Sequence, residues 1–173
     1  MEFARMAIYT VIAIFLAVVF YSSMGFRVSV LGNSMEPGLA AGQNVLVNTY
    51  SYRLGSPSRG DIIAFYPGGD ESMHPSVKRI VAIPGDSVQI LNGTLLINGV
   101  PSTWSDQHTG ITNAGIAEDL ILLDDDEYFV IGDDPEESED SRSAGIGLVQ
   151  EDMIIGKVWL ALPAEGSGLH VPQ

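Results

Sequence analysis

The chain has 173 residues, 46% of them hydrophobic, and its 22 acidic and 8 basic residues give a net charge of −14. This acidic balance excludes a basic nucleic-acid footprint and a polybasic grip on anionic lipid, because both need clustered positive charge. The absence of cysteine excludes disulfides, zinc–thiolate sites and a cysteine nucleophile. The 19 glycines and 9 prolines favour a turn-rich β protein over a helical bundle.

The first element in chain order is an uncharged apolar segment from Met6 to Met24, flanked by Arg5 and Arg27. A helix that spans a bilayer needs about 20 apolar residues. The segment therefore predicts a retained transmembrane helix within a membrane anchor over residues 1–27, with the lipid bilayer as its partner. A cleaved signal peptide and a buried core helix are the alternatives. No small-x-small cleavage site stands out after the segment.

Residues 28–173 predict a single β-rich domain. Short apolar stretches bounded by Gly, Pro, Asn or Asp are typical of strands, and we expect strands at 28–31, 45–47, 61–66, 77–83, 88–91, 94–97, 128–131 and 154–162. Asn92-Gly93 predicts a two-residue type I′ hairpin. The connections include a long polar loop at 101–119, an acidic loop at 132–147 and a frayed tail at 163–173. The expected fold class is all-β, mostly antiparallel, barrel-like or folded over on itself, with one N-terminal transmembrane helix.

Ser34 and Lys78 are the first candidates for chemistry. Ser34 lies in a Gly-, Asn- and Pro-containing loop, where a serine that caps the backbone is the ordinary interpretation. Strand alternation places Lys78 on one face with Ile80 and Ala82, and Arg79 on the other. Burial on an apolar face disfavours the charged amine, as a lysine base requires. The alternative is an edge-strand lysine that prevents aggregation.

Histidine and metal chemistry are the competing hypotheses. A Ser–His–Asp triad is recognised by geometry, so His74, His108 and His170 remain candidates, although each lies in loop-like polar surroundings typical of the surface. The acidic loop could bind calcium, but its glycine and glutamate positions do not match the EF-hand spacing. A solvated acidic loop is the simpler interpretation, and we expect no metal and no organic cofactor.

Four segments stand out together behind the apolar N-terminus: Gly32-Asn33-Ser34-Met35-Glu36-Pro37, Arg59 to Phe65, Val77 to Asp86, and Gly132 to Arg142. In this order and spacing they resemble the sequence boxes of type I signal peptidases, and the resemblance extends to about Leu162. It implies that Ser34 is the nucleophile, because the family's serine precedes a Met shortly after the membrane segment. It also implies that Lys78 is the general base.

The same resemblance assigns supporting roles in the acidic loop. Ser138 would hydrogen-bond the Lys78 amine, Asp140 and Arg142 would form a supporting ion pair, and Asp133 would have a structural role. Three positions vary from the family pattern. The family often has Asn at the position of Asp134 and Arg at that of Pro135. Some members have a serine, and others a glycine, at the position of Gly32, where the serine hydroxyl helps to stabilise the oxyanion.

The implied function is that of a membrane-bound serine endopeptidase that removes signal peptides from exported preproteins, cutting after small residues in an Ala-x-Ala pattern. The resemblance implies a single-pass protein of the cell membrane with its catalytic domain on the extracytoplasmic side. One alternative is a non-catalytic assembly factor for pilus or surface proteins, which would lack the Ser or the Lys. Another is a self-cleaving repressor-like protease, which would need a DNA-binding domain.

Overall fold

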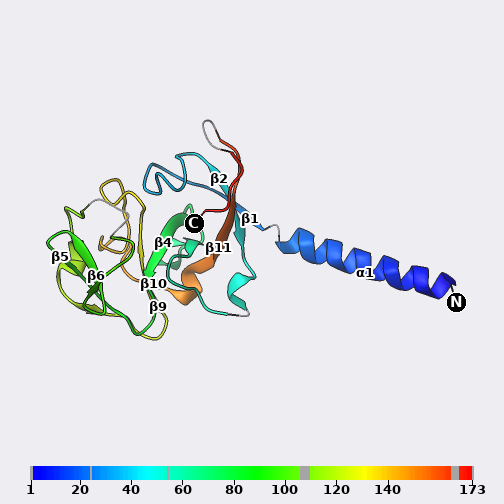
Figure 1. The fold of residues 1–173 in the computed structure, drawn as a ribbon, viewed down its shortest axis with the longest axis horizontal. Helices are drawn as coiled ribbons and strands as arrows, with labels where there is room; N and C mark the ends of the chain where they lie inside the picture. Colours follow the sequence, from blue (N-terminus) through cyan, green and yellow to red (C-terminus); the bar gives the residue numbers. More distant parts are fainter. Residues whose placement is uncertain (1, 24, 54, 106–109, 165–167, 173) are drawn as a thin grey trace.

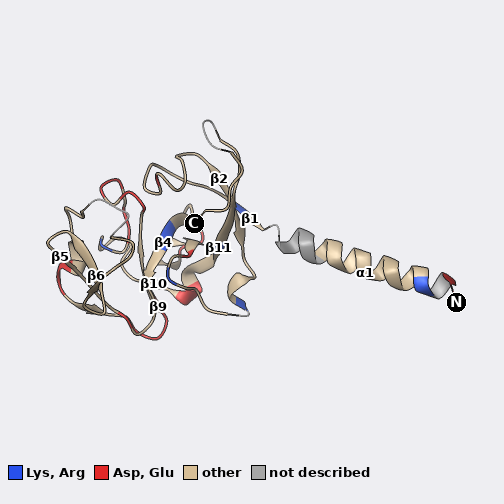
Figure 2. Ribbon diagram, viewed as in Figure 1, with Lys and Arg blue, Asp and Glu red and all other residues tan. Residues whose placement is uncertain are grey.

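A computed structural model describes residues 2–23, 25–53, 55–105, 110–164 and 168–172. The chain forms one N-terminal helix, α1 (Glu2–Ser23), and a body of two antiparallel β-sheets (Figure 1). Helix α1 extends away from the sheets, and charge along its described residues is confined to Glu2 and Arg5 at its start (Figure 2). Its large apolar side chains between Met6 and Val18 are exposed.

The expected transmembrane helix requires a correction. Within the described residues, no helix is both long and apolar enough to cross a membrane. The segment Met6–Met24 enters α1 as far as Ser23, and Met24 lies outside the described residues.

The larger sheet positions the candidate site. Its strand order is β1 (Phe26–Ser29), β2 (Asn44–Asn48), β11 (Ile154–Ala161), β3 (Ile62–Phe65), β4 (Ser76–Ala82), β9 (Glu127–Ile131) and β10 (Val149–Gln150). All neighbouring pairs are antiparallel. The second sheet has the order β7 (Val100–Pro101), β6 (Thr94–Ile97), β5 (Ser87–Leu91) and β8 (Ile121–Leu122).

The mostly antiparallel β class is confirmed, and each of the expected strands is present with ends shifted by at most two residues. Asn92 and Gly93 have φ values of 50° and 78°, which confirms the type I′ hairpin, since that turn needs positive φ at both central residues. The strands β7, β8 and β10 were not predicted. Each has two residues, too few for an alternating pattern. Short 3₁₀ helices complete the chain at η1 (Ser51–Arg53), η2 (Pro67–Gly69), η3 (Gly115–Glu118) and η4 (Glu151–Met153).

Apolar side chains cover both faces of the larger sheet. In β3, Ile62 and Ala64 enter one core cluster while Ile63 and Phe65 enter another, as alternation along a strand requires. A third cluster lies against the second sheet and includes Trp104, Ile111 and Ala117. All three belong to the segment 101–119, which the sequence predicts to be a polar loop. That segment therefore contributes to the core, and its isolated apolar residues gave no periodic signal.

Candidate active site

Ser34 and Lys78 meet in the interior of the β-rich body. Ser34 lies in the loop that follows β1, named here the Ser34 loop (residues 32–39), and Lys78 lies within β4. The Lys78 Nζ atom donates a hydrogen bond of 2.7 Å to Ser34 Oγ. The two residues are only 5% and 6% exposed. The fold thus brings together two buried side chains that are 44 positions apart in sequence.

The Ser34 loop is held by apolar side chains and by its own backbone. Met35 and Leu39 are fully buried in the core cluster that also contains Val77 of β4. The Leu39 amide donates to the Met35 carbonyl at 2.7 Å, which closes a turn directly after Ser34. The polar, Gly-containing sequence of this loop predicts a turn, and the two buried anchors fix that turn against the sheet.

Burial is the largest influence on the pKa of Lys78. Desolvation lowers the pKa of its amine below the ordinary lysine value, because the charged form loses its hydration. The carboxylates of Asp140 and Glu139 act in the opposite direction, and the Arg142 guanidinium again lowers the pKa. On β3 the residue paired with Lys78 is the fully buried Ile63, as expected for a lysine on an apolar face. An amine in this environment can become neutral and accept a proton.

Gly132 allows Ser138 to approach the backbone of Ser34. It directly follows β9, and a Cβ atom built there would lie 2.4 Å from both Ser138 Oγ and the Ser34 carbonyl oxygen. Ser138 Oγ donates a 2.6 Å hydrogen bond to Asp140 Oδ2. This bond leaves the lone pairs of the hydroxyl able to accept. A hydrogen bond between Ser138 and the Lys78 amine stays a prediction.

Asp140 and Arg142 form the expected ion pair. Arg142 Nε and Nη2 donate to the two carboxylate oxygens at 2.8 Å and 2.9 Å, and Asp140 is completely buried. The carboxylate also accepts from the Gly132 amide at 3.1 Å. This pair therefore ties the acidic loop to the end of β9, on the side of Gly132 where Ser138 lies.

A second ion pair supports the Ser34 loop. Arg79 Nε and Nη2 each donate to the Asp133 carboxylate at 2.7 Å. Arg79 thus points away from Lys78, as strand alternation predicts. A Cβ atom at Gly38 would lie 2.6 Å from Asp133 Oδ2, so the loop backbone packs directly on this pair. The expected structural role of Asp133 stays a prediction, with Arg79 as its observed partner.

The three departures from the family pattern have local structural consequences. Gly32 has a φ of 67°, in the left-handed region where a side chain is strained. The Asp134 amide donates to the Ser34 carbonyl at 3.0 Å, a contact that does not involve the side chain. The Pro135 carbonyl accepts from the Arg142 guanidinium. The acidic loop is therefore joined to the site by backbone groups at both varied positions.

The histidines make other contacts. His74 Nδ1 lies 2.9 Å from the neighbouring Pro75 carbonyl, and His170 Nε2 lies 3.2 Å from the Gly38 carbonyl. His108 is outside the described residues. In the described contacts, the basic side chain that reaches Ser34 Oγ is that of Lys78. Within the described ranges, no three His, Asp or Glu side chains form a group that could hold a metal ion.

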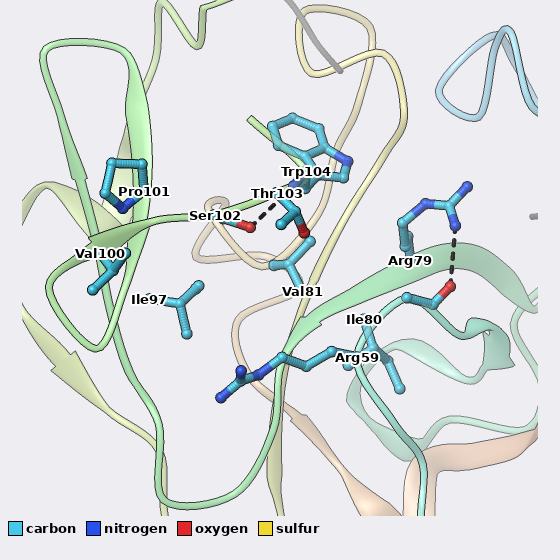
Figure 3. Close-up of a pocket in the computed structure, with 11 residues that line it drawn as sticks. Arg59, Arg79, Ile80, Val81, Ile97, Val100, Pro101, Ser102, Thr103 and Trp104 are labelled. Carbon is cyan, nitrogen blue, oxygen red and sulfur yellow. Dashed lines mark hydrogen bonds between the residues drawn. The ribbon is translucent and has the colours of Figure 1, made fainter. Parts of the chain in front are cut away.

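Two cavities differ in their relation to Lys78. A small one of about 60 Å³ is lined by Lys78 itself and by Val30, Leu31, Val77 and residues 74–76. A larger one of about 530 Å³ lies between β4 and the second sheet (Figure 3). Arg59 and Arg79 line it, but their guanidinium groups pair with Asp86 and Asp133. Of these two cavities, the small one is lined by Lys78.

The fold and site define a class of protein: a mostly antiparallel β domain in which a buried lysine meets a serine hydroxyl, an arrangement suited to serine nucleophilic chemistry. The family model described as "Signal peptidase, peptidase S26" matches residues 2–162. The chain therefore belongs to the S26 family of signal peptidases.

Curated relatives agree with this assignment. The chain is 33% identical over 147 residues to signal peptidase IB of Staphylococcus aureus strain Mu50, with 75% of this chain and 73% of the relative covered. It is 33% identical over 134 residues to signal peptidase I P of Bacillus subtilis subsp. natto, covering 73% and 71%. A crystal structure of a signal peptidase I from Enterococcus faecalis V583 aligns with 26% identity, a TM-score of 0.45, and coverage of 60% of this chain and 97% of that chain.

Sequence reasoning missed the roles of Gly38, Gly132 and Glu139. Glu139 acts on the charge of Lys78 through space, and no sequence pattern marks that proximity. The glycines are needed because other groups approach their backbone closely. Their signal in the sequence is weak: one glycine follows Pro37, and the other directly follows a strand-like stretch.

Replacing Lys78 by methionine should stabilise the protein at neutral pH. Because the folded pKa of Lys78 is lowered, the unfolded chain binds a proton that the folded chain does not, between the folded pKa and the ordinary value of about 10.4. Burial therefore costs stability below that window, and the cost disappears as pH rises through it. We expect a Tm increase of about 2–4 °C for each 1 kcal/mol gained at pH 7, shrinking toward pH 10.

Thermal melts of the two proteins across this pH range measure the difference. Lys157→Met is the matched control, because Lys157 is 43% exposed in its side chain and pairs with Asp61. That variant should not gain stability at pH 7. A Lys78→Met variant that melts clearly below wild type at pH 7 would show that Lys78 is a paired, charged lysine.

Proposed function

We propose that this protein is a serine endopeptidase that removes N-terminal signal peptides from exported preproteins, with Ser34 as nucleophile and Lys78 as general base. The observation that carries the proposal is the 2.7 Å contact between Lys78 Nζ and Ser34 Oγ in a buried site. The lowered pKa of the lysine supports its role as a base. Membership of the signal peptidase family, and relatives of that name, support the substrate class.

The reaction follows from this geometry as acyl transfer. Neutral Lys78 takes the Ser34 proton while Ser34 Oγ attacks the scissile carbonyl carbon. The tetrahedral intermediate collapses as Lys78 gives that proton to the leaving amine, and the peptide bond breaks to leave an ester on Ser34. Lys78 then deprotonates a water molecule that hydrolyses the ester and restores the serine hydroxyl. The Ser34 backbone N–H is the proposed oxyanion donor.

The substrate would bind as an extended strand beside Lys78. Strand β9 pairs with β4 only from Arg79 onward in the described register, so Ser76 to Lys78 offer a free edge on that side. An extended peptide can add to such an edge through its backbone. The adjacent cavity of about 60 Å³ has the volume of roughly two water molecules. This size supports a preference for a small residue, such as alanine, before the cut.

Ser138 and its ion pair would orient the base. The Ser138 hydroxyl donates to Asp140, and Arg142 holds Asp140 in place. A hydroxyl fixed in this way can accept a hydrogen bond from the Lys78 amine and direct it toward Ser34. On this proposal Ser138→Ala lowers the rate substantially while Ser34 remains intact.

Helix α1 would associate the domain with a lipid bilayer. Its described middle exposes large apolar side chains around the whole circumference and not on one stripe, among them Tyr9, Val11, Ile12 and Ile14. A helix that is hydrophobic around its circumference is stable when apolar surroundings cover it. A protein of charge −14 cannot rely on attraction to anionic lipid, so this apolar surface is the proposed contact.

Removal of either member of the proposed dyad should abolish cleavage. Ser34→Ala removes the nucleophile, Lys78→Ala removes the base, and Lys78→Arg keeps a permanent positive charge that cannot accept the proton. We expect each variant to lose at least about 10⁴-fold in kcat/KM. The assay is cleavage of a preprotein with alanine at the first and third positions before the cut, using protein purified free of the host's own enzyme.

His74→Ala tests the competing histidine base: its ring contacts the Pro75 carbonyl and lines the small cavity, so the variant should keep kcat near the wild-type value and change KM at most. Full activity of purified Lys78→Ala would contradict the dyad. A wild-type protein without any activity would instead favour the assembly-factor alternative.

The activity of the wild-type protein should rise with pH. Lys78 must be neutral to act, so kcat/KM of the free enzyme increases through the folded pKa of Lys78, which desolvation lowers. We expect the ascending limb in the neutral-to-alkaline range, below the ordinary lysine value of about 10.4. Initial rates at low substrate concentration measure this limb. Activity that peaks below about pH 6, where even a strongly tuned lysine is charged, is incompatible with this base.

Membrane association can be measured by flotation. The full chain should float with neutral phosphatidylcholine vesicles, whereas the double variant Ile12→Asp/Leu16→Asp should remain at the bottom of the gradient. A charged residue within the bilayer costs about 2.5–3.5 kcal/mol. Thr10→Ser is the conservative control on the same helix. Equal flotation of the aspartate variant would contradict the proposed role of α1.

A further inference from the structure

The C-terminal segment returns to the Ser34 loop. Beyond the end of β11, His170 pairs with Ala161 in an antiparallel bridge. The Ala161 amide donates to the His170 carbonyl at 2.9 Å, and the His170 amide donates to the Ala161 carbonyl at 3.3 Å. This part of the tail, which the sequence predicts to be frayed, is thus attached to the larger sheet at a defined residue.

The His170 ring lies between two carbonyl groups. Its Nε2 atom is 3.2 Å from the Gly38 oxygen, and its Nδ1 atom is 3.0 Å from the Gly168 oxygen. Carbonyl oxygens only accept hydrogen bonds, so each nitrogen contributes by donating. The imidazolium form satisfies both contacts at once, and a neutral ring satisfies one of them. The side chain is therefore aimed at the Ser34 loop, and its own segment supports the ring.

Gly38, whose carbonyl lies near the His170 ring, also packs closely on an ion pair. Its backbone packs against the Asp133 carboxylate, where a Cβ atom would lie 2.6 Å from Oδ2. That carboxylate is held by two hydrogen bonds from Arg79. The Gly38 backbone therefore contacts both the Asp133–Arg79 ion pair and the His170 ring. It directly precedes Leu39, whose amide closes the turn that begins after Ser34.

The geometry points to His170 as a positioning residue for Ser34, an inference that rests on the proposed function. By donating to the Gly38 carbonyl, the ring holds the turn of residues 35–39 against the Asp133–Arg79 pair and so fixes the direction of Ser34 Oγ. In its described contacts His170 touches neither Ser34 nor Lys78, so it takes no part in proton transfer. Removing it should disturb the attack geometry and leave substrate binding in place.

The test compares four substitutions in the full chain. His170→Ala removes the donor and His170→Phe replaces it with an apolar ring. His170→Gln keeps an N–H that can reach the Gly38 carbonyl. Leu169→Ala is the control, because the adjacent Leu169 side chain is 61% exposed. A small displacement of a reacting group can cost up to about 10²-fold in rate. We expect about a tenfold lower kcat with KM within about twofold for Ala and Phe, recovery for Gln, and wild-type behaviour for the Leu169 variant.

Each outcome decides the inference. Ser34→Ala, assayed in parallel, separates this inference from the proposed function. If the Ser34→Ala protein is active, the proposed function and the role of His170 are both wrong. If it is inactive while His170→Ala and His170→Phe are fully active, only the role of His170 is wrong. A higher KM with unchanged kcat, or a failure of glutamine to restore kcat, also overturns it. If His170→Ala melts below the assay temperature, the comparison of Phe with Gln at a lower temperature, where both are folded, decides the question.

Discussion

The burial of the Lys78 amine against Ser34 is the constraint on which the rest of this site depends. Desolvation lowers the pKa of Lys78, but the nearby carboxylates of Asp140 and Glu139 raise it. Arg142 pairs with Asp140 and also acts directly to lower the pKa of Lys78. The ion pair therefore limits the effect of a buried carboxylate on the amine, in addition to fixing the acidic loop.

A buried cation and its counter-charges are expensive unless each has a partner. Both site carboxylates that have lost their water, Asp133 and Asp140, receive two hydrogen bonds from an arginine. Asp133 lies against the Ser34 loop at Gly38, whereas Asp140 accepts a hydrogen bond from Ser138. Two of the carboxylates that act on Lys78 are therefore each held by an arginine.

Antiparallel pairing assembles these parts from distant stretches of chain. Strand β4 supplies Lys78 and Arg79 on its two faces, and the neighbouring β9 ends at the acidic loop that carries Asp133 and Asp140. The Ser34 loop reaches the same place because Met35 and Leu39 are anchored in the core. The end of β11 brings the C-terminal tail back to Gly38 through His170. Sheet order, and not closeness in sequence, makes these segments neighbours.

Much of the fold was predictable because strand alternation and turn chemistry are local. The segments around Ser76–Ala82 and Thr94–Ile97 could be read from apolar runs between glycine, proline and asparagine. The two-residue strands were missed, since they are defined by their partners. The transmembrane prediction rested on counting apolar residues, and the described part of α1 does not support it. Trp104 and Ile111, spaced irregularly in a polar segment, gave no indication that they enter the core.

The sequence by itself determined the family, the β class and the residue types available for chemistry, because these depend on identity and spacing along the chain. It also placed Lys78 and Arg79 on opposite faces, since the side-chain period of a strand is fixed. Only the tertiary structure decided that the Lys78 amine lies against Ser34 Oγ, that Gly132 admits Ser138, and that His170 contacts the Ser34 loop. Distances across a sheet and the desolvation of an amine arise from residues far apart in the chain, so no local pattern encodes them.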